Sequence, residues 1–294
     1  MDGTKAAQRG TSFTGARLPA QMTTMIGRTQ EITTLVDLLS QEEVRLVTLT
    51  GPGGVGKTRL GLEVARALQE HFLDGVFFIS LAALCEQGQV LLAIARAAGM
   101  DEGSGQALKR RLHEYLREKQ CLLLLDNFEH LLSAAPLISD LLAHASRLTI
   151  LATSREMLHL YGEREIIVHP LALPQIADRG LALSSAAMTL FVERAQAAKP
   201  AFALNEENAR TIAEICVQLD GLPLAIELAA ARIKLLSPRA ILARLSSRLS
   251  LLTGGARDLP GRQQTLRNTL DWSYDLLNRE EQHFFRRLGV FAGS

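Results

Sequence analysis

The sequence predicts an α/β region with a parallel sheet, followed by an all-α region. Strand-like and helix-like segments alternate from Val44 to Val168, strand runs such as CLLLL are apolar on both sides, and strand signals stop after about Leu173. Parallel strands need long crossovers, usually helices, so the alternation places helices on both faces of a sheet. Strands that are apolar on both sides fit a covered sheet better than an exposed edge.

Five segments carry the strand signals, and helical periodicity fills the gaps between them. The strands are expected at Val44 to Thr50, Val76 to Ser80, Cys121 to Asp126, Leu148 to Thr153 and Glu165 to Val168. The helices are expected at Lys57 to Phe72, Val90 to Ala98, Gln106 to Glu118 and Leu131 to Ala145. In the third helix the leucines share one face and the arginines the other, which predicts a helix with one side buried.

The second region reads as consecutive helices. They are expected at Ser185 to Lys199, Glu206 to Leu219, Leu224 to Leu236 and Pro238 to Ser250. Gly221 and Pro223 supply a helix stop followed by a helix start. A glycine- and arginine-rich linker from Thr253 to Gln264 then precedes two short helical patterns.

Composition and charge narrow the classes of partner. The chain is 47% hydrophobic and 21% charged, with 32 basic and 31 acidic residues, so no net field would draw it onto nucleic acid or an anionic membrane. No apolar run approaches the roughly 18 residues of a membrane span, and the first twenty residues hold no signal-peptide core. We expect a soluble, cytoplasmic protein without a membrane partner.

The three cysteines, Cys85, Cys121 and Cys216, are odd in number and lie among apolar neighbours. This pattern predicts reduced thiols in a reducing compartment. The absence of a CxxC pair argues against zinc.

The stretch GPGGVGKT, from Gly51 to Thr58, satisfies the pattern GxxxxGK[ST] between a predicted strand and a predicted helix. Glycines let the backbone N–H groups wrap closely around phosphate oxygens, and a helix N-terminus adds partial positive charge. Lys57 can reach the β and γ phosphates, and the Thr58 hydroxyl can ligate Mg²⁺. A glycine-rich turn with an incidental lysine is the alternative, and the flanking strand and helix disfavour it. The predicted Walker A contacts are Gly51, Gly53, Gly54, Val55, Gly56, Lys57 and Thr58.

A second acidic strand end is needed to hold the metal. Four leucines run into Asp126 at the end of a predicted central strand, which predicts a Walker B aspartate that binds Mg²⁺ directly or through water. Many ATPases that carry these two motifs have a second acid at the next position, but here that residue is Asn127. Glu129 is the nearest candidate base for activating water, and it could equally cap the following helix. Hydrolysis should therefore be slow.

The strand LTILAT leads into Ser154 and Arg155. A cation at the tip of the strand beside the phosphate-loop strand can sense a γ phosphate, as internal arginines do in phosphoryl transfer. The alternative is a solvated surface arginine. Position favours the sensor role for Arg155.

The motifs MIGRTQE, GPGGVGKT, LLLLDNFEH, TSRE, GLPLAIELAAAR and RQQTLRNTLDWSYDLL follow one another in this order. Together they resemble the STAND class of signal-transduction ATPases, close to NB-ARC proteins and especially to the ATPase core of bacterial LuxR-type and SARP-type transcriptional regulators. The resemblance covers nearly the whole chain from Pro19. GLPLA is its most family-specific part, because the other two nucleotide motifs occur in many NTPases.

The resemblance implies a P-loop NTPase sheet of order 2-3-1-4-5 and an adenine nucleotide, ATP or ADP, clamped between regions. Ile26, Gly27 and Arg28 would lie near the adenine and ribose, with Leu222 and Pro223 on the other side. It also implies four parts: a flexible arm at residues 1–22, a nucleotide-binding domain at 23–175, a helical domain at 176–255 and a partial winged-helix domain at 256–294. The sequence ends at Ser294, so we expect that last module to be incomplete.

These observations predict an ATP/ADP switch with weak Mg²⁺-dependent ATPase activity in a signalling or transcriptional regulator. Its sensor or output domains would lie outside these residues, and the ATP state could self-associate. An AAA-like remodelling ATPase that turns over continuously as a ring is the alternative, and Asn127 speaks against it. Direct DNA binding through TLRNTLDWSYDLL is a third reading, disfavoured because its exposed positions are insufficiently basic.

Overall fold

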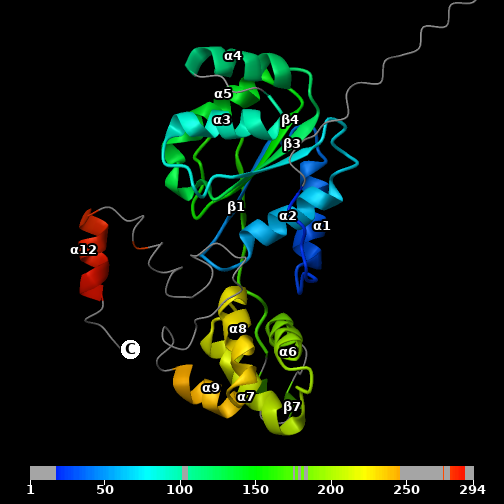
Figure 1. Ribbon diagram of the computed structural model, residues 1–294, viewed down its shortest axis with the longest axis vertical. Coiled ribbons are helices and arrows are strands. Elements are labelled where there is room, and N and C mark those ends of the chain that lie inside the picture. Colours follow the sequence, from blue (N-terminus) through cyan, green and yellow to red (C-terminus); the bar gives the residue numbers. More distant parts are fainter. Residues whose placement is uncertain are drawn as a thin grey trace, which may run out of the picture.

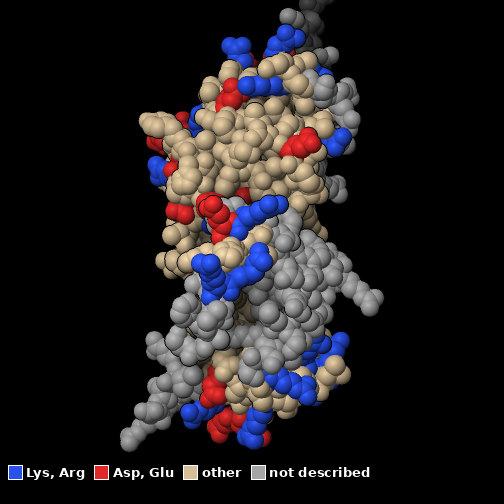
Figure 2. Space-filling model, turned by 90° about the vertical axis from the view of Figure 1, so that its left-hand side faces the viewer, with Lys and Arg blue, Asp and Glu red and all other residues tan. Residues whose placement is uncertain are grey.

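The computed structural model describes residues 18–100, 105–174, 176–177, 180–181, 185–245, 274 and 279–288. Within them an α/β region, from helix α1 to strand β5, precedes a helical region, from α6 to α9 (Figure 1). No helix in this part of the chain is both long and apolar enough to cross a membrane. Figure 2 shows acidic and basic side chains interspersed over the described surface of one face.

A five-stranded parallel sheet forms the centre of the α/β region, as the sequence predicts. Its strands are β1 (Leu46–Thr50), β2 (Val76–Ser80), β3 (Cys121–Asp126), β4 (Leu148–Thr153) and β5 (Arg164–Ile167). Three of them match the predicted bounds and two differ by one or two residues. β1, β3 and β4 are buried along their whole length.

The observed strand order is β2-β3-β4-β1-β5, which corrects the expected order 2-3-1-4-5. β4 pairs with both β3 and β1, and β5 lies outside β1 as an edge. The sequence LTILAT of β4 is apolar enough for an interior position, whereas Arg164, Glu165 and Ile167 of β5 are exposed. A polar strand is better placed at an edge, where one side meets water.

Helices cover both faces of the sheet, which confirms the predicted layers. They are α1 (Thr29–Leu39), α2 (Lys57–Ala67), α3 (Gln87–Ala97), α4 (Gly105–Leu116) and α5 (Ala135–His144), with short 3-10 turns at Phe128–His130 and Leu132–Ala134. Leu123 and Leu125 of β3 pack with α3, α4 and α5, and Leu122 and Leu124 pack with α1 and α2. Successive strand residues point to opposite faces, so this alternation buries β3 from both sides.

The helical region has its own core and contains α6 (Ala186–Ala198), α7 (Glu206–Gln218), α8 (Pro223–Ala230), a 3-10 turn (Ala231–Lys234) and α9 (Pro238–Arg244). Local capping explains its helix starts. Ser185 accepts a hydrogen bond from the Met188 N–H, Asn205 forms a reciprocal capping box with Asn208, and Pro223 occupies the first turn of α8.

Three features differ from the sequence predictions. Helix α1 was not predicted, and a short antiparallel pair, β6 (Ile176–Ala177) and β7 (Gly180–Leu181), follows the point where strand signals were expected to stop. The part of the expected flexible arm that the structure describes contacts α2: Arg66 donates to the Pro19 carbonyl and Gln21 donates to the Arg59 carbonyl at 3.2 Å.

The rest of the expected flexible arm, residues 1–17, lies outside the described residues. So does most of the predicted winged-helix segment, of which the structure describes Tyr274 and helix α12 (Arg279–Leu288).

Candidate functional site

The glycine loop connects the carboxyl end of β1 to the start of α2. Gly54 and Gly56 have φ angles of +80° and +101°, a left-handed conformation that side chains with a Cβ rarely adopt. The Lys57 ammonium lies over the same loop and donates to the Gly51 carbonyl at 2.6 Å and the Pro52 carbonyl at 3.1 Å. The loop therefore curls around its own lysine at the amino end of a helix, an arrangement that suits an anion.

Asp126 lies at the carboxyl end of β3 and is only 3% exposed. One of its oxygens, Oδ1, accepts hydrogen bonds from the hydroxyls of Thr58 at 2.6 Å and Thr153 at 2.8 Å. The two residues predicted to bind metal, Thr58 and Asp126, are thus brought into direct contact. Thr153, at the end of β4, joins them and was not predicted as a site residue.

The donor set at this position fits Mg²⁺. It combines a hydroxyl with a buried carboxylate, and Mg²⁺ prefers hard oxygen ligands. Among the described residues no lysine, arginine or histidine forms an ion pair with Asp126, although a buried charge normally requires a partner. A divalent cation would provide the missing positive charge.

Asn127 explains how a carboxylate two residues beyond Asp126 reaches the same edge of the sheet. Its φ angle of +69° turns the chain sharply, its N–H donates to the Thr153 hydroxyl at 2.9 Å, and its side-chain amide donates to Glu129 Oε1 at 2.6 Å. Asparagine tolerates this left-handed conformation better than most residues. The amide thus holds the Glu129 carboxylate beside the end of β3.

Glu129 is also close to the predicted sensor. The Arg155 Nε lies 3.5 Å from Glu129 Oε1, and the Glu129 side chain is 7% exposed. Glu129 Oε2 is buried and accepts no hydrogen bond from the described residues. A buried carboxylate oxygen without a hydrogen-bond donor retains its capacity to accept a proton.

The segment before β1 packs between the two regions. Ile26 packs against the helical core, and a Cβ at Gly27 would lie 2.3 Å from the Ala186 Cβ, so this position requires glycine. Arg28 is 3% exposed, donates to the carbonyls of Val55 and His169 at 3.3 and 2.5 Å, and pairs with Glu31. The Arg28 guanidinium therefore ties this segment to the glycine loop.

The GLPLA segment meets the glycine loop from the helical region. The Leu224 N–H, one of the first N–H groups of α8, donates to the Gly54 carbonyl at 3.2 Å. Leu222 packs against the core of both regions, and Pro223 begins α8. Gly221, with φ +66°, accepts from the Leu171 N–H at 3.0 Å. The loop and the proline segment are thus in main-chain contact.

An ion-pair group that sequence reasoning missed lies across the same boundary. Glu227 of α8 accepts from Arg194 of α6 at 2.9 Å and lies 3.7 Å from Arg59 of α2. Arg59 directly follows Thr58 and also donates to Thr23 and Thr24. Burial lowers the pKa of Arg59, and Glu227 acts in the opposite direction. No sequence pattern links these residues, because they lie on three separate helices.

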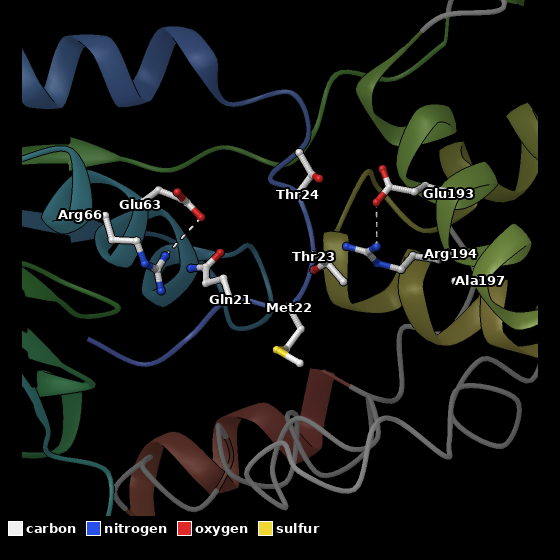
Figure 3. Close-up of a pocket in the computed structure, with 9 residues that line it drawn as sticks. All are labelled: Gln21, Met22, Thr23, Thr24, Glu63, Arg66, Glu193, Arg194 and Ala197. Atoms are coloured by element: carbon white, nitrogen blue, oxygen red, sulfur yellow. Dashed lines mark hydrogen bonds and ion pairs between the residues drawn. The ribbon is translucent and has the colours of Figure 1, made fainter. Parts of the chain in front are cut away.

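A cavity of about 560 Å³ opens between α2, residues 21–24 and α6 (Figure 3). Figure 3 shows Glu63 with Arg66 and Glu193 with Arg194 on its two sides, each as an ion pair. None of the predicted nucleotide-binding residues lines it. The candidate site is therefore defined by the loop and strand ends and not by this cavity.

Comparison with known proteins agrees with this geometry. Residues 41–164, which contain the glycine loop, Asp126 and Arg155, match the family model described as an AAA domain. The chain contains a P-loop NTPase domain. A chain of Drosophila ORC, solved bound to DNA, has a similar fold, with a TM-score of 0.51 and 13% identity over 80% of this chain and 70% of that one. At this identity the likeness shows the P-loop NTPase fold alone.

Two curated relatives extend the similarity beyond the P-loop NTPase domain. An HTH-type transcriptional regulator from Mycobacterium tuberculosis is 44% identical over 257 residues, which is 87% of this chain and 28% of the relative. The regulatory protein AfsR of Streptomyces griseus is 28% identical over 297 residues, 95% of this chain and again 28% of the relative. The chain thus spans just over a quarter of the length of these regulators.

Proposed function

We propose that this chain is an ATP/ADP switch with slow Mg²⁺-dependent hydrolysis, the regulatory core of a STAND-type, NB-ARC-like transcriptional regulator. The observation that carries the proposal is the hydrogen bond from the Leu224 N–H to the Gly54 carbonyl, at 3.2 Å. It joins the phosphate-binding loop to the first turn of α8. A conformational change in the loop would therefore be transmitted directly to the helical region.

Nucleotide binding rests on the loop and its neighbours. The N–H groups of the glycine loop and the Lys57 ammonium bind the phosphates, and Thr58 and Asp126 hold Mg²⁺. The segment from Ile26 to Arg28 and the residues Leu222 and Pro223 flank the nucleotide from either side. Bound Mg²⁺–ATP supplies the phosphoanhydride bond and a metal charge that neutralises the phosphates.

Hydrolysis rests on Glu129. Its buried Oε2, which accepts no hydrogen bond from the described residues, is the group best suited to orient a water and take its proton. Its other oxygen is held by Asn127 at 2.6 Å and by Arg155 at 3.5 Å. Asn127, by a hydrogen bond, and Arg155, by an ion pair, therefore fix the position of the Glu129 carboxylate. Slow turnover is part of the proposal, because Asn127 stands where a second acid is expected and a switch needs long-lived states.

Arg155 is proposed as the sensor that distinguishes the two nucleotides. Its guanidinium contacts Glu129 in the structure described here, and a γ phosphate would compete with Glu129 for it. ATP and ADP would then favour different positions of the strand end that carries Arg155. A ligand shifts an equilibrium only by its differential affinity for the two states, about 1.4 kcal/mol for each tenfold.

The regulatory role is supported by the relatives, which are described as a transcriptional regulator and a regulatory protein. Because the chain spans 28% of each, the output and sensor domains are proposed to lie in other parts of such a polypeptide. Self-association in the ATP state belongs to the same proposal.

Small-angle scattering of the purified chain tests the switch. We expect different profiles with Mg²⁺–ADP and with Mg²⁺ and a non-hydrolysable ATP analogue, and no such difference in Lys57→Ala. Identical profiles under saturating concentrations of both nucleotides would remove the switching role. Identification of the copurified nucleotide is a second test, because retained ADP indicates a latched state.

A continuously working AAA-like ATPase is the second candidate. It is favoured by the AAA domain match and by the Oε2 of Glu129, which accepts no hydrogen bond from any described residue. A steady-state rate above about 1 per second, within the usual range of enzymes, would favour it. A slower rate, combined with nucleotide-dependent scattering, would favour the switch.

A further inference from the structure

Three metal-ligating side chains meet on the surface of the α/β region, far from the glycine loop in the fold. His113 lies in the last turn of α4, and Asp140 and His144 lie one turn apart on α5. Each offers one ligand atom within 4.8 Å of the others. α4 and α5 lead into the amino ends of β3 and β4, whereas Asp126 and Arg155 follow the carboxyl ends (Figure 1). The cluster is therefore at the opposite edge of the sheet from the nucleotide site.

The three side chains already lie close together, with Asp140 between the two histidines in the contacts that they make. His113 Nε2 lies 2.7 Å from Asp140 Oδ2, and His144 Nδ1 lies 3.8 Å from Asp140 Oδ1. The two imidazole rings stack with their centres 4.0 Å apart and their planes within 10°. A neutral imidazole is the form that binds metal.

We propose that His113, Asp140 and His144 bind a divalent transition metal ion, of which Zn²⁺ fits best. Two imidazole nitrogens and one carboxylate oxygen are ligands that Zn²⁺ accepts readily, with water completing a tetrahedral set. Ligand atoms around such an ion lie roughly 3.4 Å apart, given metal–ligand lengths of about 2.0–2.2 Å. The His113–Asp140 contact has to open by less than about 1 Å to admit the ion.

The surroundings of His144 match those of a metal ligand. Its Nδ1 lies 2.8 Å from the backbone carbonyl of Asp140, and a hydrogen bond donated there leaves the lone pair on Nε2. Metal-binding histidines usually donate their other ring N–H in this way. The side chain is 53% exposed, so an ion in solution can reach the ring.

The scaffold beneath the cluster is rigid. Leu112 of α4 and Leu141 of α5, each next in sequence to a proposed ligand, are buried in the same core. A carboxylate and two imidazoles on packed helices give a bound ion fixed positions.

Lys109 is the competing cation. Its ammonium lies 3.0 Å from Asp140 Oδ2, so an ion at the cluster displaces it or repels it. Removing the ammonium in Lys109→Met should tighten metal binding, whereas a merely structural ion pair would give no gain.

The sequence prediction against zinc considered only cysteine pairs. It could not have found a cluster of two histidines and an aspartate. Only Asp140 and His144 have a regular spacing, and the third ligand comes from a different helix, 27 positions earlier than Asp140. Helix packing alone brings His113 to them.

The test is calorimetric titration of ZnCl₂ into the full chain with Mg²⁺ present, in a Cys85→Ser background because Cys85 is an exposed thiol. We expect about one equivalent of Zn²⁺ bound, and an affinity at least about tenfold lower in His144→Ala and in Asp140→Asn. His71→Ala removes an exposed histidine elsewhere and is the matched control, expected to bind as the parent does. Equal affinity in all three variants would overturn the proposal.

Two further measurements separate this site from the nucleotide site and from misfolding. Lys57→Ala should bind Zn²⁺ normally even though it loses nucleotide. Zn²⁺ should raise the melting temperature of the parent but not of His144→Ala, whose own melting temperature without metal reports whether it is folded. Loss of Zn²⁺ binding in Lys57→Ala, with His144→Ala unaffected, would assign the ion to the phosphate loop and defeat the proposal.

Discussion

The N–H of Leu224 donates a hydrogen bond to the carbonyl of Gly54, and a Cβ added to Gly54 would lie 3.0 Å from the Cβ of Leu224. Helix α8 of the helical region therefore packs directly against the glycine loop. Because the contact is through main-chain atoms, side-chain substitution at Leu224 leaves the hydrogen bond itself possible. Substitution of Gly54 is the sharper probe.

Gly54→Ala should destabilise the chain by about 1–2 kcal/mol from backbone strain, because a Cβ is disfavoured at φ +80°. Crowding against Leu224 adds to this cost. Gly99→Ala is the matched control: its φ is +73°, but a Cβ there would meet nothing within 4 Å. Urea denaturation of both variants should show the larger loss in the free energy of unfolding for Gly54→Ala. Equal losses would contradict close packing of α8 against the glycine loop.

Lys57→Ala should weaken the binding of both ATP and ADP by at least about a hundredfold, because charge-assisted hydrogen bonds to phosphate are among the stronger ones in proteins. Fluorescence titration with a labelled adenine nucleotide measures this loss. Lys119→Ala, which removes a lysine paired with Asp74 at 2.8 Å away from the loop, is the control. Tight binding by Lys57→Ala would show that the loop does not hold the phosphates.

Glu129→Gln should slow ATP hydrolysis by about 10²–10⁴-fold, the usual contribution of a general base, and leave nucleotide affinity within a few fold. The substitution keeps the shape of the side chain but removes its capacity to take a proton. Single-turnover hydrolysis measures the rate. Glu156→Gln, an exposed carboxylate one residue after Arg155, is the control. An unchanged rate in Glu129→Gln would leave the carboxylate a structural partner of Asn127 and Arg155.

Arg155→Gln should reduce the preference for ATP over ADP, since an uncharged side chain no longer attracts a γ phosphate. The ratio of the two dissociation constants is the quantity to compare, because a general loss of folding would weaken both nucleotides alike. We expect the ratio to fall at least about tenfold, or about 1.4 kcal/mol. A constant ratio would assign Arg155 to the support of Glu129 alone.

The sheet was predictable because most of its strands are largely apolar runs, with β5 the exception, and the glycine loop because its motif has a fixed spacing. The strand order was not, since the place of β4 between β3 and β1 depends on pairing that its residues do not encode locally. The β6–β7 pair was missed because each of its strands has only two residues. Helix α1 was missed although Leu35 and Leu39 lie at helical spacing and are buried, so the sequence did carry its signal.

Part of the candidate site was likewise predictable from the sequence, and part was not. Lys57, Thr58 and Asp126 follow from motif spacing, and the structure brings them together through a 2.6 Å hydrogen bond between the last two. The reach of Glu129 depends on the left-handed turn at Asn127, a backbone feature that sequence spacing does not show. Likewise the contacts of Glu227 join residues from three helices, and only tertiary packing brings them together.

Cys121 and Cys216 should make the chain less stable above about pH 9. Burial raises the pKa of each thiol to about 12, from its ordinary value of 9.0. Above pH 9 the unfolded chain loses these protons while the folded chain keeps them, so stability falls as pH rises toward 12 and is unaffected below 9. The slope should be about 1.4 kcal/mol per pH unit for each thiol.

Urea denaturation at several pH values between 8 and about 10.5 measures this slope. Other groups also titrate in this range, so the comparison is with Cys121→Ala/Cys216→Ala, in which both buried thiols are absent. The double variant starts from a lower stability, because it leaves two small cavities, but it should lose less stability per pH unit than the parent. Equal slopes in the two proteins would mean that water reaches the thiols in the folded chain, and that neither pKa is raised by burial.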